Sequence, residues 1–138
     1  LLMFAARAVH LENKILPALL GGVWVVCDRF TDATYAYQGG GRGSNWELIA
    51  TLEQAVQGDL RPDLTLLLDA DPETGMKRAR QRGEADRFET ERNRFFASVR
   101  EAYLERASKE PQRMRVIDAS AELEQVQSAI CAEIRPFL

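Results

Sequence analysis

Residues 64–69, LTLLLD, decide the fold, because a short apolar run bounded by polar residues predicts a buried strand. Residues 23–28, VWVVCD, and residues 115–118, RVID, have a similar form, so three expected strands each end in an aspartate. The segments between them are long enough to hold crossover helices. Strands alternating with helices predict an α/β fold, with a parallel sheet covered by helices on both faces.

Helices are expected in the joining segments, where apolar residues recur at helical spacing and capping or stop residues bound the pattern. Ser44-Asn45-Trp46-Glu47 has the form of a capping box with Ser44 as the N-cap. The glycines of residues 39–43 are expected to end the helix before it. The expected helices cover residues 1–20, 31–38, 44–57, 71–82, 90–108 and 120–134.

The composition indicates one ordinary globular domain over residues 1–138. The net charge is −3 and hydrophobic residues make up 46% of the chain. These values exclude a disordered chain or a disulfide scaffold, and the mild acidity disfavours a nucleic-acid partner. No stretch reaches the roughly 18 apolar residues of a membrane span. Cys27 and Cys131 lie in apolar runs, so we expect buried thiols in a reducing cytoplasm.

Aspartates at the carboxyl ends of the expected strands are candidates for a site, because ligands of open α/β sheets bind beyond that edge. These are Asp28, Asp69 and Asp118. For Asp69 and Asp118, capping of the next helix is the favoured explanation. Asp28 differs because Arg29 follows it, which would place a cation for a phosphate beside a carboxylate that can support Mg²⁺. A strand-end cap with a surface ion pair remains open.

A basic run follows the second expected strand. It contains Lys77, Arg78, Arg80 and Arg82, with Arg87 soon after. Guanidinium groups keep their charge and donate in a fork that matches phosphate oxygens, so the run suits a polyphosphate. A solvated helix face is the alternative.

Two further groups of residues suit a nucleoside. Thr34, Tyr37 and Gln38 precede the glycine run, and Gln offers both a donor and an acceptor to a base edge while Tyr offers a flat wall. Arg7 lies in the middle of an apolar helix, near Met3 and Phe4, where its guanidinium could clamp a base. A flexible glycine turn and an Arg7 that extends to solvent are the alternatives.

Five stretches together resemble the bacterial thymidylate kinases. They are LLMFAARAVHL (1–11), WVVCDRFTDATYAYQGGGRG (24–43), GDLRPDLTLLLD (58–69), RARQRGEADRFE (78–89) and RVIDAS (115–120). The resemblance covers nearly the whole chain. It implies a fold like that of the P-loop nucleoside monophosphate kinases, incomplete at the N-terminus. It also implies ATP-dependent phosphorylation of dTMP to dTDP in dTTP biosynthesis, with Mg²⁺ and a homodimer.

The resemblance assigns roles to individual residues. Arg29 would hold the dTMP phosphate, and Asp28 would support Mg²⁺ indirectly. Phe4 and Arg7 would contact thymine, although Met3 holds the position at which the family often has its stacking residue. Thr34 and Gln38 would contact the base edge and Tyr37 would lie under the sugar. A lid over residues 78–89 would bring Arg78, Arg82 and Arg87 to ATP, with Arg29 and Arg82 as the catalytic arginines.

The family's glycine-rich phosphate loop is expected upstream of Leu1, so the chain as given is expected to be inactive. Two other functions remain open. One is a different nucleoside or nucleotide kinase of the same fold. The other is a non-catalytic, dimer-forming module that binds a nucleotide. A cytoplasmic protein with no nucleic-acid or membrane partner is expected in each case.

Overall fold

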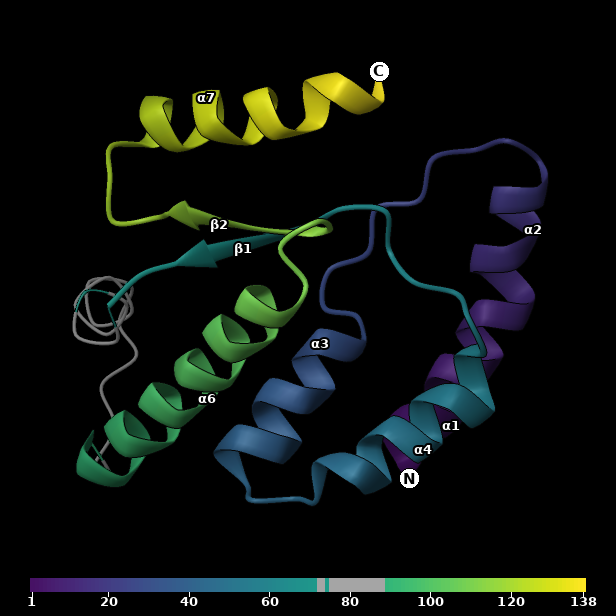
Figure 1. The fold of residues 1–138 in the computed structure, drawn as a ribbon, viewed down its shortest axis with the longest axis horizontal. Coiled ribbons are helices and arrows are strands. Elements are labelled where there is room, and N and C mark those ends of the chain that lie inside the picture. The colour runs from purple at the N-terminus through teal and green to yellow at the C-terminus, as the bar shows by residue number, and fades with distance from the viewer. Residues whose placement is uncertain (72–73, 75–88) are drawn as a thin grey trace. The chain divides into compact units, whose positions relative to one another are not determined.

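The computed structural model describes residues 1–71, 74 and 89–138 (Figure 1). These residues form two compact units, Leu1–Arg61 and Pro62–Leu138. The single domain over 1–138 therefore stays a prediction. Most of the helix expected over 71–82 and nearly all of the lid at 78–89 lie outside the described residues.

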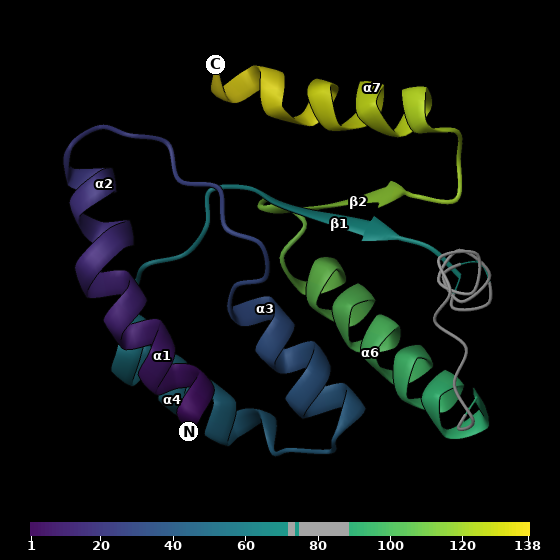
Figure 2. The same cartoon turned by 180° about the vertical axis from the view of Figure 1, so that it is seen from behind.

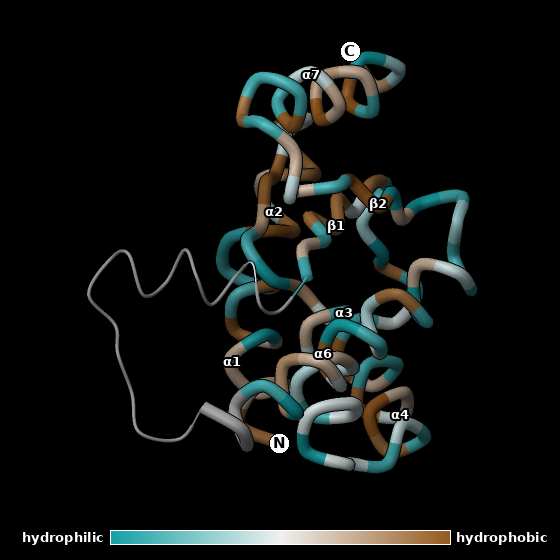
Figure 3. The backbone as a smooth tube through the Cα atoms, turned by 90° about the vertical axis from the view of Figure 1, so that its left-hand side faces the viewer, coloured by the Kyte–Doolittle hydropathy of each residue, from teal (hydrophilic) through white to brown (hydrophobic). Residues whose placement is uncertain are grey.

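The first unit begins with a helical segment of three parts. Helix α1 (Leu2–His10) continues through a π-helix, η1 (Leu11–Ile15), into α2 (Leu16–Leu20). The helix expected over 1–20 is thus confirmed. A π-turn widens the helix just before Pro17, which has no backbone N–H to donate. Figure 3 shows hydrophobic residues, in brown, along much of α2.

The second helix of this unit extends further than its glycines predict. Helix α3 (Thr31–Thr34) passes into a π-helix, η2 (Tyr35–Gly41), so the glycine run does not end the helix at residue 39. The reason is close packing. A Cβ atom on Gly39 would lie 2.5 Å from Nε1 of Trp46. Gly39 is therefore needed for the approach of the Trp46 ring and not for a turn.

Helix α4 (Trp46–Gln57) ends at Gly58 as expected, but its cap differs from the prediction. Asn45, and not Ser44, is the N-cap, and its side chain accepts a hydrogen bond of 2.7 Å from the Glu47 backbone N–H. Asn and Ser are equally suited to accept a hydrogen bond from an unpaired backbone N–H of the first turn. Asn45 therefore takes the role predicted for Ser44, and the helix starts one residue later. Gly58 has a φ of 56°, a left-handed value that favours glycine.

Aromatic and aliphatic side chains from α1, η2 and α4 form the core of the first unit. Phe4, Tyr35 and Ile49 are buried together, and the Tyr35 ring packs edge-on against Trp46 with centroids 5.3 Å apart. The core thus joins α4 to the two helical segments, α1 and α3–η2, that carry the candidate base-contacting residues.

The strand expected over Val23–Cys27 is not formed, so that prediction is wrong. A strand needs ladder hydrogen bonds, and within the described residues none joins 24–28 to a neighbouring strand. Trp24 and Val26 are exposed, Val26 by 95%. Cys27 and Cys131 are exposed too, so the expectation of buried thiols is also wrong.

The second unit contains the sheet. Strands β1 (Thr65–Asp69) and β2 (Met114–Asp118) are parallel and pair in register from Thr65 opposite Met114 to Asp69 opposite Asp118. Helix α6 (Glu89–Lys109) and helix α7 (Leu123–Ile134) lie on opposite sides of this pair (Figures 1 and 2). A short 3₁₀ turn, η3 (Arg135–Phe137), follows. The predicted α/β class, with a parallel sheet between helices, is confirmed.

The helix expected over 120–134, with Ser120 as its cap, starts later than predicted, because the N-cap of α7 is Glu122. Ser120 instead donates its backbone N–H to Asp118 Oδ1 at 2.9 Å, and its hydroxyl donates to the same oxygen. Asp118 thus forms a local turn after β2, and the helix starts later. Among the described helices, none combines the length and apolar content needed to cross a bilayer.

Replacing Gly39 with alanine should destabilise the first unit by roughly 1–3 kcal/mol, because the new methyl group would overpack the Trp46 ring. Urea unfolding measures the change. Gly43→Asn is the control, since nothing lies within 4 Å of its site and Asn tolerates positive φ. If the loss is the same in a Trp46→Leu background, the Trp46 contact is not its cause.

Candidate functional site

Arg7 is the centre of the candidate site. It is only 9% exposed, so the alternative in which Arg7 extends to solvent is wrong. Its Cζ atom lies 5.3 Å from the Phe4 ring centroid and 4.9 Å from that of Phe30. Its Nη1 donates to Oγ1 of Thr34 at 3.3 Å. The structure therefore brings together Phe4, Arg7 and Thr34, while Met3 is exposed.

The charge of Arg7 is held in a largely apolar setting. Burial lowers its pKa, and the acidic groups of Cys27, Glu53 and Asp32 oppose that shift. A guanidinium has five N–H donors. Within the described residues a single side-chain hydrogen bond engages them, so donors remain for a ligand oxygen.

Residues 23–28, which form neither helix nor strand, are called the extended segment below. Arg29 follows this segment and has an uncommon backbone geometry. Its φ is 62°, a left-handed value that costs a non-glycine residue about 1–2 kcal/mol. Its Cζ lies 5.4 Å from the Tyr37 ring centroid. The side chain is exposed. The arrangement joins two of the predicted site residues and leaves the cation open to an anion.

The helical segment α3–η2 links both arginines. Thr34, which accepts from Arg7, and Tyr37, which lies under Arg29, are three residues apart. Gln38 follows, and it is half-buried. One short helical stretch thus carries Thr34, Tyr37 and Gln38, three of the residues predicted to contact the nucleoside. It contacts both the buried Arg7 and the exposed Arg29.

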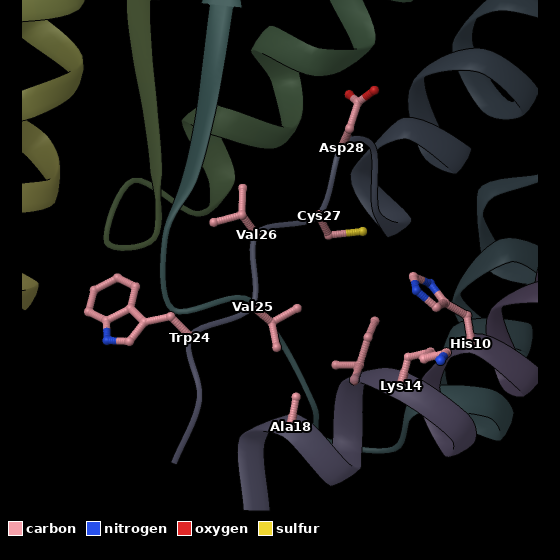
Figure 4. A pocket seen from close by; sticks show the side chains of 9 residues that line it. His10, Lys14, Ala18, Trp24, Val25, Val26, Cys27 and Asp28 are labelled. Carbon is pink, nitrogen blue, oxygen red and sulfur yellow. The ribbon is translucent and has the colours of Figure 1, made fainter. Parts of the chain in front are cut away.

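Asp28 lies at the rim of a hollow of about 400 Å³ between α1–α2 and the extended segment (Figure 4). Figure 4 shows Val25 and Cys27 pointing toward the helical side, while Trp24 and Val26 point away. The hollow is lined by His10, Lys14, Ile15, Ala18, Trp24, Val25, Val26, Cys27 and Asp28. Over the described ranges, no set of three or more acidic, Cys or His side chains could hold a metal.

The strand-end aspartates of the second unit have partners of their own. Arg100 Nε and Nη2 donate to the two oxygens of Asp69 at 2.6 and 2.8 Å. These bonds raise the pKa of Arg100. The Ser120 hydroxyl and N–H lower the pKa of Asp118. Asp69 is thus half of an ion pair, and the helix that it would cap in the alternative explanation lies mostly outside the described residues.

Other predicted residues cannot be placed. Arg78, Arg82 and Arg87 lie outside the described residues, so the structure does not test whether they face Arg29. Phe30, Glu53 and Arg100 are not among the site residues predicted from the sequence. For Glu53 a signal was available, because a carboxylate stands between Ile49 and Val56 on the apolar side of α4. For Arg100 no local pattern marks it among the other charges of α6.

Thr34→Val should lower the free energy of unfolding by roughly 1–3 kcal/mol, because buried Arg7 loses its hydroxyl acceptor while the side-chain volume is kept. Chemical denaturation gives the value. Thr51→Val is the matched control, since that hydroxyl is exposed and bonds only to Glu47 O. An equal decrease in the free energy of unfolding for the two variants would show that the Arg7–Thr34 hydrogen bond does not stabilise the fold more than an exposed hydroxyl does.

Comparison with known proteins supplies the family. The Thymidylate kinase family model matches residues 1–130. The thymidylate kinases of Pseudomonas putida (strain W619) and Ectopseudomonas mendocina are 62% and 61% identical over 96% and 100% of this chain. That of Hahella chejuensis is 60% identical over 94% of the chain. The chain spans 62%, 64% and 66% of the lengths of the Hahella, P. putida and E. mendocina proteins.

A solved structure agrees. The crystal structure of thymidylate kinase from Ehrlichia chaffeensis superposes with a TM-score of 0.72 at 30% identity, covering 98% of this chain and 63% of that one. The fold is therefore that of a P-loop nucleoside monophosphate kinase, as the resemblance implied. With a family model that spans almost the whole sequence and relatives at 60% identity or more, this chain belongs to the thymidylate kinase family.

Proposed function

We propose that this chain supplies the dTMP-binding part of a kinase that transfers the γ-phosphate of ATP to dTMP, giving dTDP and ADP in dTTP biosynthesis. The observation that carries the proposal is the buried Arg7 guanidinium, held between two aromatic rings with donors to spare. A buried cation of this kind suits the carbonyl oxygens and flat face of a pyrimidine. Membership of the family supports the same substrate.

Each residue of the cluster has a role in this proposal. Arg7 and Phe4 contact thymine, and Thr34 and Gln38 contact its polar edge. Tyr37 lies under the deoxyribose, where a ring disfavours an extra hydroxyl. Arg29, exposed above Tyr37, binds the phosphate. Because Arg7 and Arg29 contact a helical stretch three residues apart, a single nucleotide can reach both.

The reaction needs little covalent chemistry from the protein. An oxygen of the dTMP phosphate attacks the γ-phosphorus of ATP, and the bond to the bridging oxygen of ADP breaks. Arg29 holds the attacking phosphate and offsets charge on it, which is a positioning and electrostatic contribution. Arg78, Arg82 and Arg87 are proposed to do the same for ATP, with Arg82 nearest the transferred group.

The described residues fit Mg²⁺ only through Asp28. Mg²⁺ keeps several waters and commonly takes one or two carboxylates together with substrate phosphates, so a single exposed aspartate beside Arg29 is compatible with indirect support. When bound, the ion would neutralise charge on the ATP phosphates. Asp28 would orient a water of its shell.

A homodimer in the cytoplasm, with no nucleic-acid or membrane partner, completes the proposal. The segment α1–α2 is apolar on two sides, and a helix of this kind is normally covered on both. Its inner side carries Phe4 and Leu11. Its exposed apolar residues include Leu2, Val9, Leu16 and Leu20. A second copy related by a two-fold axis would place the same apolar stripe on both sides of the contact and so cover it.

Arg29→Ala should weaken dTMP binding by roughly 10- to 100-fold, because a charge-assisted contact to the phosphate is lost. Isothermal titration of this chain with dTMP measures the affinity. Arg135→Ala, in the C-terminal turn of the second unit, is the control and should bind as the unaltered chain does. A folded chain that does not bind dTMP at all would overturn the site.

Phosphate transfer distinguishes the related kinases. The full-length gene product that carries these residues is assayed with ATP and dTMP, dUMP, dCMP or thymidine as acceptor. We expect dTMP to be the preferred acceptor. Preference for thymidine would contradict the proposal, because the phosphate held by Arg29 would then be unnecessary. Nucleotide binding without any transfer would favour a non-catalytic module.

Val9→Lys should dissociate the dimer, because it places a charge in the exposed stripe of α1–α2. Light scattering after gel filtration gives the mass, expected near twice the 15.6 kDa of the chain before substitution and near 15.6 kDa after it. Leu123→Lys, at an exposed position of α7, should leave the dimer intact. A monomeric unaltered chain would contradict the proposed stripe contact.

A further inference from the structure

Two buried polar pairs join α4 to the α3–η2 helix. The Tyr35 hydroxyl donates to Glu53 Oε2 at 2.7 Å. One turn away on both helices, the Thr31 hydroxyl donates to Gln57 Oε1. Since Thr31 and Tyr35 are four residues apart, and so are Glu53 and Gln57, the pairs form two rungs between antiparallel helical faces.

The rungs are buried. Glu53 is 5% exposed and Gln57 is 8% exposed, and both hydroxyl partners are buried as well. Apolar side chains would fill the same space without desolvating a carboxylate. Directional bonds, unlike apolar contacts, fit in one register only, because a displaced partner leaves a buried polar group unsatisfied.

Arg61, which follows α4, contacts both Glu53 and the backbone at the end of that helix. Its Nε lies 3.1 Å from Glu53 Oε1. Its Nη1 donates to the carbonyl oxygens of Gly58 and Leu60, each at 2.8 Å. Gln57 Nε2 also donates to Leu60 O at 3.3 Å. Contacts from residues 58–61, just after α4, therefore hold the side chains of both acceptors in place.

The residues that face the nucleotide lie between and just beyond the rungs. Thr34 immediately precedes Tyr35 and accepts from Arg7 at 3.3 Å. A shift of one residue along a helix moves a side chain by about 1.5 Å and 100°, which would take the Thr34 hydroxyl out of reach of Arg7. Tyr37 and Gln38 belong to the same helical stretch and would move with it.

We propose that Glu53 and Gln57 are positioning residues, which set the register of α3–η2 on α4 and thereby place Thr34 and Gln38 against the base. This proposal rests on the proposed dTMP site. It assigns the two residues no contact with substrate. It predicts that their loss impairs recognition of the base more strongly than the phosphate contact made by Arg29, which precedes α3.

The test compares two ligands by calorimetric titration of this chain. One is dTMP and the other is 2-deoxyribose 5-phosphate, which has the sugar and phosphate without the base. Glu53→Ala and Gln57→Ala should each weaken dTMP binding about tenfold or more, roughly 1.4 kcal/mol or more. Affinity for the sugar phosphate should change less than threefold. Glu47→Ala and Gln54→Ala, exposed positions of the same helix, are the matched controls.

A conservative variant separates positioning from folding. Glu53→Gln keeps an oxygen that accepts from Tyr35, so dTMP affinity should return to within about threefold of the unaltered chain. Equal weakening for both ligands, or a fall in the number of binding sites with an unchanged Kd, would overturn the proposal. If the unaltered chain binds the sugar phosphate but not dTMP, or neither ligand, the dTMP site itself is wrong.

Discussion

A buried cation, the Arg7 guanidinium, is the constraint on which the first unit of this protein depends. A charge that is only 9% exposed needs partners, and the surroundings supply two aromatic rings, one hydroxyl and nearby carboxylates. Those partners come from α1, from Phe30 and the α3 helix that follows it, and from α4. The need to accommodate this one charge therefore explains why segments far apart in sequence are packed together.

The same constraint accounts for the polar interior around it. Glu53 opposes the loss of charge at Arg7 and also accepts from Tyr35, so one carboxylate serves both the electrostatics and the packing of the helices. A buried polar network costs folding free energy when some of its groups lack hydrogen-bond partners, and it makes the structure rigid when all of them have partners. Among the described residues, no fully buried side-chain nitrogen or oxygen lacks a hydrogen-bond partner.

Much of the fold followed from local signals, and the failures have physical causes. Strand β1 was predicted from its apolar run. The prediction holds because β2 is present as a hydrogen-bonding partner. The equally apolar run at 23–27 was mistaken for a strand because composition does not show whether a hydrogen-bonding neighbour is present. Arg7 and Thr34 were both singled out, but their contact spans 27 residues of sequence and could not be derived from spacing. Glu53 carried a local signal, as a carboxylate on the apolar side of α4, but its contact with Tyr35 spans 18 residues and could not be derived from spacing.

A crystal structure of this chain with dTMP tests the account most directly. The account predicts one nucleotide that touches both arginines, with Arg7 N–H groups at about 2.7–3.2 Å from a thymine oxygen and the Arg29 guanidinium on the phosphate. A nucleotide bound with its base away from Arg7, or with its phosphate held by other residues while Arg29 stays in solvent, would contradict it.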